Sequence, residues 1–137
     1  MKTVLFAAAM ALPAAGAVMA LLAAGAARAQ DAAAGEKVFG QCRACHQVGE
    51  TAKNQVGPKL NGLFGRTAGS VEGYAYSPAN KASGLVWDDA TFTDYIRDPR
   101  AKIPGTKMIF PGVKNEKQVA GLIAFLRQYG EDGKKKQ

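Results

Sequence analysis

The segment Gln41–Val48 reads QCRACHQV and contains every cysteine and the one histidine of the 137-residue chain. Two residues separate Cys42 from Cys45, and His46 follows directly. Thiols and imidazoles are the side chains that bind soft metals, form disulfides or attach cofactors through sulfur. Because all of them lie within one short segment, the chemistry of this segment constrains the fold more than any other feature.

The N-terminal segment, residues 1–29, has the pattern of a secretory signal peptide. Lys2 gives a positive start, residues 4–27 carry no charge, and residues 27–29 form an A-x-A exit. We expect cleavage after Ala29. The apolar run is long enough to span a bilayer, so an uncleaved anchor is the alternative. Both interpretations leave the rest of the chain outside the cytoplasm, and we expect a periplasmic protein.

Removal of this segment would leave residues 30–137, which form one small domain of 108 residues. Without Lys2 and Arg28 the domain has 16 basic and 11 acidic residues, a net charge of +5. This surplus suggests an acidic docking partner. Nucleic acid is a weak alternative, because no basic helix interleaved with aromatic residues is present. We expect residues 131–137 to form a flexible tail.

Apolar residues recur at helical spacing, and no strand-like alternation of useful length occurs, so we expect an all-α fold. A first helix is expected over residues 32–41, capped by Asp31, and a short one near residues 78–83. A third follows a cap at Asp88 and stops before Pro99. The last helix follows a cap at Asn115 and ends by Gly130. Its expected buried face is Val119, Leu122, Ile123 and Leu126, and that of the third helix is Phe92, Tyr95 and Ile96.

Residues 47–76 show no periodicity and are rich in glycine. A loop of about thirty residues is unusual inside a compact domain unless it has a function. A few short helices also bury little apolar surface in a chain of this length. A large, flat, apolar cofactor enclosed by these loops would answer both difficulties.

Four chemistries begin from the CRACH segment. A Cys42–Cys45 disulfide is possible in an exported protein, but it closes a very small loop and leaves His46 without a role. A redox dithiol is expected beside a βαβ pattern, which is absent. Structural zinc needs four ligands, and the chain has no second ligand cluster. Two thiols and a following histidine are the pattern that attaches c-type haem, which we therefore predict.

The second axial position of such a haem decides between an electron carrier and an open iron site. Cleavage after Ala29 would leave Met108 as the one remaining methionine. A lone methionine usually fills a core position on a helix. Met108 instead lies in IPGTKMIFPG, a loop between two Pro/Gly turns. We expect its thioether to be the sixth ligand.

Several longer segments resemble one family in their order and spacing: GEKVFGQCRACHQV, VGPKLNGLFGRTAG, GYAYSPAN, LVWDDATFTDYIRDP and IPGTKMIFPG. The chain resembles class I cytochromes c over residues 33–129, with the nearest likeness to bacterial cytochrome c2 or c550 and to mitochondrial cytochrome c. The resemblance implies a haem packed between crossing N-terminal and C-terminal helices. It also implies that Gly35 and Phe39 meet Leu122 and Phe125.

The resemblance also implies a role for each site residue. Cys42 and Cys45 would form thioethers to one covalently bound haem c, with His46 and Met108 as its axial iron ligands. Pro58 would accept a hydrogen bond from the imidazole. The remaining haem contacts would be Arg66, Tyr76 and Trp87 near the propionates, and Asn80, Tyr95 and Thr106 near the methionine.

Five basic positions match a ring around the exposed haem edge, where they would steer the protein to acidic faces of redox partners. The implied function is that of a monomeric one-electron carrier and not an enzyme. It would pass electrons from a bc1-type complex or a dehydrogenase to a terminal oxidase or a photosynthetic reaction centre. A peroxidase or gas binder with a labile sixth ligand is the alternative, and a disulfide-bonded module is a second one. The five basic positions of the ring around the haem edge are Lys37, Lys53, Arg100, Lys107 and Lys114.

Overall fold

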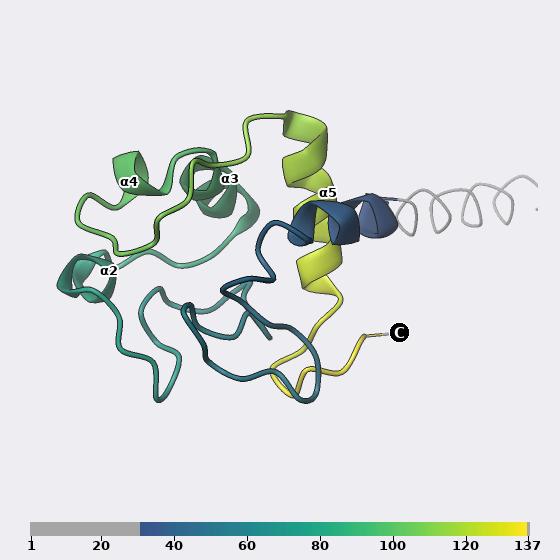
Figure 1. Cartoon of the computed structure of the whole chain (residues 1–137), viewed down its shortest axis with the longest axis horizontal. Coiled ribbons are helices and arrows are strands. Elements are labelled where there is room, and N and C mark those ends of the chain that lie inside the picture. Colours follow the sequence, from purple (N-terminus) through teal and green to yellow (C-terminus); the bar gives the residue numbers. More distant parts are fainter. Residues whose placement is uncertain (1–30, 137) are drawn as a thin grey trace, which may run out of the picture.

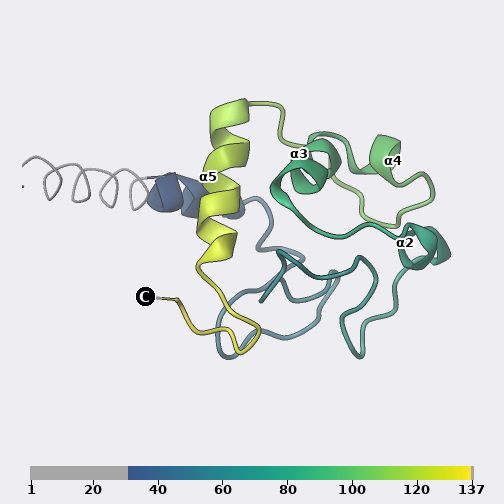
Figure 2. The same ribbon diagram turned by 180° about the vertical axis from the view of Figure 1, so that it is seen from behind.

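The computed structural model describes residues 31–136, shown from two sides in Figures 1 and 2. The proposed signal peptide, the proposed anchor and Gln137 lie outside the described residues. A first helix covers residues 31–39. It is followed by α2 (Pro78–Ala82), α3 (Asp89–Arg97), α4 (Pro99–Lys102) and α5 (Glu116–Arg127). Strand-like pairing within residues 31–136 is limited to two isolated bridges, so the predicted all-α fold is confirmed.

The two longest of the labelled helices begin where their capping residues predict. The Asp88 side chain accepts a hydrogen bond from Thr91 N at 2.7 Å, and Asn115 accepts one from Gln118 N at 3.1 Å. Each cap satisfies a backbone N–H that has no partner within its helix. The cap predicted for the first helix is wrong, because Asp31 is itself helical.

Helix α4 was not predicted, because we interpreted Pro99 as a stop signal alone. The chain does leave α3 at Arg97, but the Asp98 side chain then accepts from Ala101 N at 3.1 Å and caps a new turn. Proline is favoured at the first position of a helix, where its missing N–H costs nothing. One Asp-Pro pair therefore ends one helix and begins the next.

The first helix and α5 cross at close range, on the right of Figure 1 and the left of Figure 2. A Cβ added at Gly35 would overlap the Gly121 carbonyl and lie 2.9 Å from Leu122 N. The Phe39 ring, which is fully buried, packs with its centroid 5.1 Å from that of Phe125. The crossing implied by the family resemblance is thus confirmed, and it needs glycine where the two backbones meet.

The glycine-rich segment 47–76 forms loops held by side-chain hydrogen bonds in place of a ladder. The buried Asn61 side chain donates to Gly49 O and accepts from Gly49 N, both at 2.9 Å. Gly57 N donates to Cys45 O at 2.8 Å and ties this loop to the CRACH segment. The loops form one wall of the molecule, which contacts α3 through Phe64 and Phe92, whose ring centroids lie 5.4 Å apart.

Residues 131–136, which we expected to be a flexible tail, fold back on the domain. Gly130 N donates to Lys134 O at 3.0 Å, and Lys136 N donates to Gln128 O at 2.7 Å. A Cβ at Gly133 would lie 2.6 Å from Glu50 N, so the turn packs closely on the loop wall.

Within residues 31–136, none of the helices is long and apolar enough to cross a membrane.

Candidate haem site

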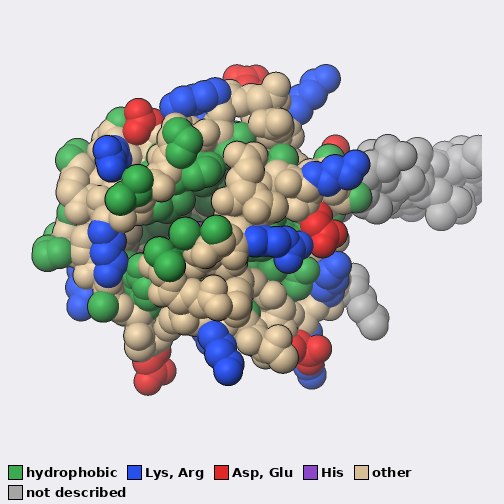
Figure 3. Space-filling view, viewed as in Figure 1, with side chains coloured by type: hydrophobic (Ala, Val, Ile, Leu, Met, Phe, Trp, Pro, Cys, Tyr) green, Lys and Arg blue, Asp and Glu red, His purple; other side chains and the backbone are tan. Residues whose placement is uncertain are grey.

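A cavity of about 300 Å³ opens on the face shown in Figure 3, where apolar side chains line a hollow between the loops and the helices. Much of its wall is apolar: Leu63, Phe92 and Ile96 lie on one part, and Leu122 and Leu126 of α5 on another. Every residue that we expected to contact haem lines this cavity. They are Cys42, Cys45, His46, Pro58, Arg66, Tyr76, Asn80, Trp87, Tyr95, Thr106 and Met108.

The CRACH segment reaches the cavity as a tight turn after the first helix. Cys42 N donates to Phe39 O at 2.8 Å, and Cys45 N and His46 N both donate to Cys42 O, at 3.0 and 2.8 Å. Cys42 and Cys45 form no disulfide with each other. Burial, with a smaller contribution from Cys45, raises the pKa of the Cys42 thiol to about 11. The turn therefore presents two thiols and an imidazole to one cavity.

The His46 imidazole is oriented by Pro58, whose carbonyl oxygen lies 2.7 Å from Nδ1. A carbonyl oxygen can only accept, so Nδ1 carries the proton and Nε2 keeps its lone pair. Burial lowers the pKa of His46, and the hydrogen bond to Pro58 opposes this shift. A neutral imidazole with a free Nε2 is the form that coordinates a metal.

Gly57 lets the loop lie against the face of the imidazole. A Cβ at this position would be 2.6 Å from His46 Nδ1 and 2.7 Å from Nε2, much closer than atoms can pack. From the sequence, Gly57 is only one of the glycines that predict loops over residues 47–76. Its signal in the sequence is its place next to Pro58, where the backbone must approach the ring for the carbonyl to accept from it.

Met108 lies in the loop between α4 and α5, half-buried at the cavity wall. The Tyr95 hydroxyl donates a hydrogen bond to Met108 Sδ at 3.1 Å, and Met108 N donates to Thr106 Oγ1 at 3.3 Å. The side chain thus belongs to the cavity and not to a helix core. The polar neighbours that we expected beside it, Tyr95 and Thr106, do contact this residue.

Two polar groups beside the cavity have no hydrogen-bond partner among the described residues. They are Arg66 Nε and Asn80 Oδ1, and both atoms are buried. Leaving such a group unpaired costs about 1–3 kcal/mol, so a polar ligand group is expected near each. Burial lowers the pKa of Arg66, although Tyr76 and Glu131 oppose this shift. A large apolar plate with acidic edge groups would fit the cavity, the two thiols and the arginine together.

The sequence did not single out some residues at the cavity mouth. Tyr74, Phe110 and the exposed Val56 and Ile109 all line it. Tyr74 could have been found, because residues two apart in an extended segment lie on the same side and Tyr76 was expected at the site. Phe110, Val56 and Ile109 lie in loops without periodicity, so only the folded chain brings them to the mouth.

The five expected basic positions fall into two groups. Lys37, Lys53 and Arg100 are exposed and form no ion pair within residues 31–136. Lys107 Nζ donates to Ala75 O, and Lys114 Nζ donates to Arg97 O. Figure 3 shows lysine and arginine side chains at several places around the apolar hollow.

An all-α domain that presents two thiols, an oriented imidazole and a thioether to one apolar cavity has the features of a c-type haem protein. The cytochrome c family model matches residues 32–130. The chain is 63% identical to cytochrome c2 of Blastochloris viridis, over 79% of this chain and 85% of that protein. It is 57% identical to cytochrome c-550 of Nitrobacter winogradskyi, over 77% of this chain and 97% of that protein.

The fold agrees with these similarities. The structure of cytochrome cH from Methylobacterium extorquens superposes with a TM-score of 0.67 at 50% identity, covering 71% of this chain and 97% of that one. The chain belongs to the cytochrome c family and has the class I cytochrome c fold. It carries one covalently bound haem c, and it is an electron-transfer protein and not an enzyme.

Proposed function

We propose that the protein is a periplasmic one-electron carrier in which His46 and Met108 are the axial ligands of a haem attached through Cys42 and Cys45. Haem c, when bound, supplies an iron centre that takes up and releases one electron. The chain would hold both axial ligands in place through the cycle and exclude water with its apolar wall.

The observation that carries this proposal is the pairing of two supported ligands at one cavity. His46 Nδ1 is bonded to Pro58 O, and Met108 Sδ accepts from Tyr95 Oη, so each side chain is oriented by a partner. Oriented ligands reduce the rearrangement that accompanies a change in charge. A site with an open sixth position would have no need to orient a thioether.

The absorption spectrum of the oxidised protein tests this ligand set. We expect the weak far-red band of an iron–sulfur bond in the wild type and its loss in Met108→Leu, while the covalent haem stays with the chain on a denaturing gel. Met10 and Met19 lie in the proposed signal peptide and cannot replace Met108 after cleavage. A wild type without the band would instead support a labile sixth ligand, as in a peroxidase or gas binder.

The electron donors and acceptors that we propose are membrane redox complexes. Lys37, Lys53 and Arg100 supply exposed positive charge. Lys107 adds charge at the cavity wall and Lys114 adds charge beside α3, while the Nζ atom of each bonds to the backbone. Such a ring fits the acidic face of a bc1-type complex or a dehydrogenase as donor. The acceptor would be a terminal oxidase or a photosynthetic reaction centre, approached by a monomeric carrier.

The location follows from the proposed division into a signal peptide, residues 1–29, and a mature domain, residues 30–137. N-terminal sequencing of the protein recovered from the periplasmic fraction should begin at Gln30. Recovery from the membrane fraction with an intact N-terminus would show that the segment is kept as an anchor.

A further inference from the structure

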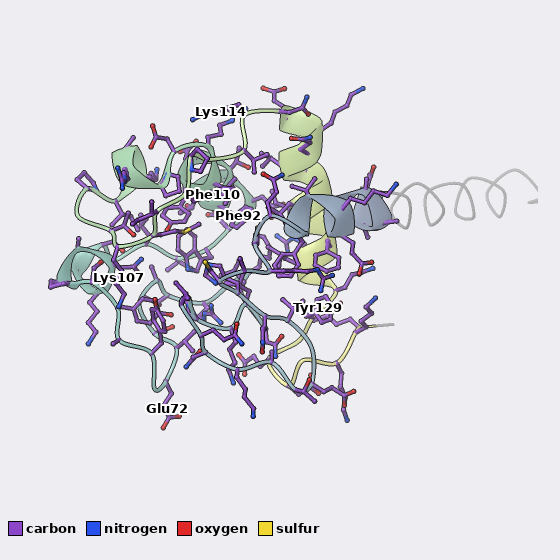
Figure 4. All side chains as sticks on the ribbon, in the orientation of Figure 1. Glu72, Phe92, Lys107, Phe110, Lys114 and Tyr129 are labelled. Atoms are coloured by element: carbon purple, nitrogen blue, oxygen red, sulfur yellow. The ribbon has the colours of Figure 1, made fainter. Side chains whose placement is uncertain are left out.

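The C-terminal segment, residues 129–136, folds back on the glycine-rich loops and brings one carboxylate to them. Figure 4 labels Tyr129 just beyond the end of α5, where the chain turns into this segment. Tyr129 O accepts a hydrogen bond from Gly62 N at 3.2 Å. A Cβ added at Gly62 would lie 2.6 Å from Glu131 Cγ and 3.1 Å from Glu131 Cα. Glu131 therefore packs directly against the backbone at Gly62.

The position of Glu131 is fixed by the fold-back on both sides of it. Gly130 N donates to Lys134 O at 3.0 Å, and a Cβ at Gly133 would lie 2.6 Å from Glu50 N. The Glu131 side chain is exposed and forms no ion pair within residues 31–136. Its negative charge is thus held at one place on the loop wall without a paired cation.

Arg66 is bonded to the same stretch of backbone. Its Nη1 donates to Asn61 O at 2.8 Å, and Asn61 is the residue before Gly62. Arg66 also lines the haem cavity, where its buried Nε has no partner among the described residues. Burial lowers the pKa of Arg66, and Tyr76 and Glu131 both oppose this shift. Glu131 and Arg66 therefore interact through their charges, although they form no direct ion pair.

The guanidinium of Arg66 can serve two acidic groups at once. It has five N–H donors and no acceptor, and one donor is used by Asn61 O. An acidic edge group of the haem would meet Arg66 at the cavity. Glu131 approaches from a segment of which no residue lines the cavity. One cation is then shared between a carboxylate in the cavity and a carboxylate outside it.

We propose that Glu131 lowers the reduction potential by drawing the Arg66 guanidinium, and with it positive charge, away from a haem propionate. The proposal rests on the proposed carrier function, in which Arg66 lies near the propionates. Positive charge near the haem favours the less charged ferrous form, so weakening this charge favours the ferric form. Glu131 acts through Arg66 and is a positioning residue. Because Glu131 is exposed, solvent and salt screen its charge and the effect is small.

Redox titration of the holoprotein measures this effect. Glu131→Gln removes the charge and keeps the shape of the side chain. We expect the equilibrium constant for reduction to rise about twofold, which is about 18 mV at about 59 mV per tenfold for one electron. Glu131→Asp keeps the charge and should keep most of the wild-type potential.

Asp132→Asn is the matched control. It removes the same charge one residue further on and keeps the side-chain oxygen that accepts from Lys134 N at 3.0 Å. Its potential should lie close to that of the wild type. Equal shifts in Glu131→Gln and Asp132→Asn, or a lower potential in Glu131→Gln, would overturn the proposal.

Arg66→Gln tests whether Glu131 acts through the arginine. Alone, this change should lower the potential, because it removes positive charge from the propionate. In the Arg66→Gln background, Glu131→Gln should shift the potential less than it does in the wild type. A shift of full size there would show that Glu131 acts on the iron by its charge alone. If Arg66→Gln does not fold, the comparison of Glu131→Gln with Asp132→Asn decides the question.

The same measurements separate this proposal from the proposed function. If Arg66→Gln lowers the potential but Glu131→Gln does not raise it, the role of Glu131 is refuted and the haem site stands. If Arg66→Gln leaves the potential unchanged, the propionate contact of Arg66 is refuted, and the role of Glu131 with it. A wild type without the far-red band refutes Met108 ligation, whatever the Glu131 variants show.

Discussion

The residue that fixes the imidazole most tightly is Gly57, which has no side chain. Its backbone lies against the ring, and any Cβ there would be within 2.7 Å of Nε2. The neighbouring Pro58 then offers its carbonyl to Nδ1. The orientation of His46 therefore depends on an absent methyl group as much as on the hydrogen bond.

Gly57→Ala should displace the imidazole or the loop. We expect a loss of about 1–3 kcal/mol in the free energy of unfolding of the holoprotein, the usual cost of overpacking, and a changed far-red band. Denaturant unfolding and the oxidised spectrum measure the two effects. Gly130→Ala is the control, because the atoms nearest to its Cβ would be Asp132 Oδ1 at 3.0 Å, Lys134 O at 3.8 Å and Lys136 Cε at 4.0 Å, all farther than the imidazole atoms are at Gly57. Equal stability of the two variants would contradict the contact.

Tyr95→Phe should lower the reduction potential. If Met108 is the sixth ligand, as we propose, the Tyr95 hydroxyl that donates to Met108 Sδ at 3.1 Å withdraws electron density from this ligand and favours the less charged ferrous form. If this hydrogen bond contributes about 0.5–1 kcal/mol, its loss lowers the potential by about 20–40 mV for one electron. Redox titration measures the shift, and Tyr129→Phe, whose ring packs on Phe125, is the control. An unchanged or raised potential in Tyr95→Phe would refute this role for the hydroxyl.

At the scale of elements, the crossing of the first helix and α5 is governed by Gly35. The two backbones approach so closely there that a Cβ would overlap the Gly121 carbonyl. Replacing a glycine inside a helix with alanine normally stabilises the helix by about 1 kcal/mol. At the crossing we expect the opposite, a loss of stability. The sign of the change in the free energy of unfolding therefore tests the close contact.

Gly35→Ala should therefore destabilise the protein, by about 1–3 kcal/mol or more, because α5 must move away. Ala33→Gly is a matched control in the same helix, since Ala33 is exposed and its loss should cost only the helix propensity, about 1 kcal/mol. Denaturant unfolding of both holoproteins measures the difference. A Gly35→Ala protein that is more stable than the wild type would show that the helices do not touch at this point.

The elements differ in how far the sequence could predict them. Asp88 and Asn115 are capping residues before periodic apolar runs, so the starts of α3 and α5 follow from local chemistry. Helix α4 was missed because Pro99 both ends one helix and begins the next. The rule that a helix stops before a proline predicts only the first of these two effects. The fold-back of residues 131–136 depends on contact between Gly133 and the distant loop near Glu50, which no local pattern contains.

At the candidate site, too, the sequence predicted what depends on local residues and missed what depends on distant contacts. CRACH identified the haem chemistry, since the two cysteines and the one histidine of the chain all lie there. Met108 as the sixth ligand stays a prediction, although its side chain lines the same cavity. The sequence did not show that Lys107 bonds inward to Ala75 O, because a lysine beside a loop is ordinarily exposed. Which basic residues are available to a partner therefore became clear only from the fold.

At the scale of the whole molecule, both the apolar cavity mouth and the exposed charges bear on the approach of a partner. The cavity opens on the face of Figure 3, with the exposed Val56 and Ile109 at its mouth. Lys53 and Arg100 remain exposed and form no ion pair within residues 31–136, whereas Lys107 and Lys114 bond to the backbone. Long-range attraction to a partner depends on charge alone. Close contact with a partner's carboxylates also needs side chains that can extend to them, which favours Lys53 and Arg100 over Lys107 and Lys114.

Reversal of exposed charge should therefore slow electron transfer to an acidic partner in a salt-dependent way. We expect Lys53→Glu and Arg100→Glu each to lower the second-order rate with a bc1-type complex about two- to fivefold at low salt, within the range that steering supplies. The difference should shrink above about 0.1 M salt, where the Debye length falls below about 10 Å. Lys136→Glu makes the same charge change on the folded-back C-terminal segment, at a residue outside the proposed ring, and should have the smaller effect. Stopped-flow kinetics over a series of salt concentrations measures all three. If the three variants are slowed equally, net charge alone steers the protein; if none is slowed, the partner does not dock on a basic face.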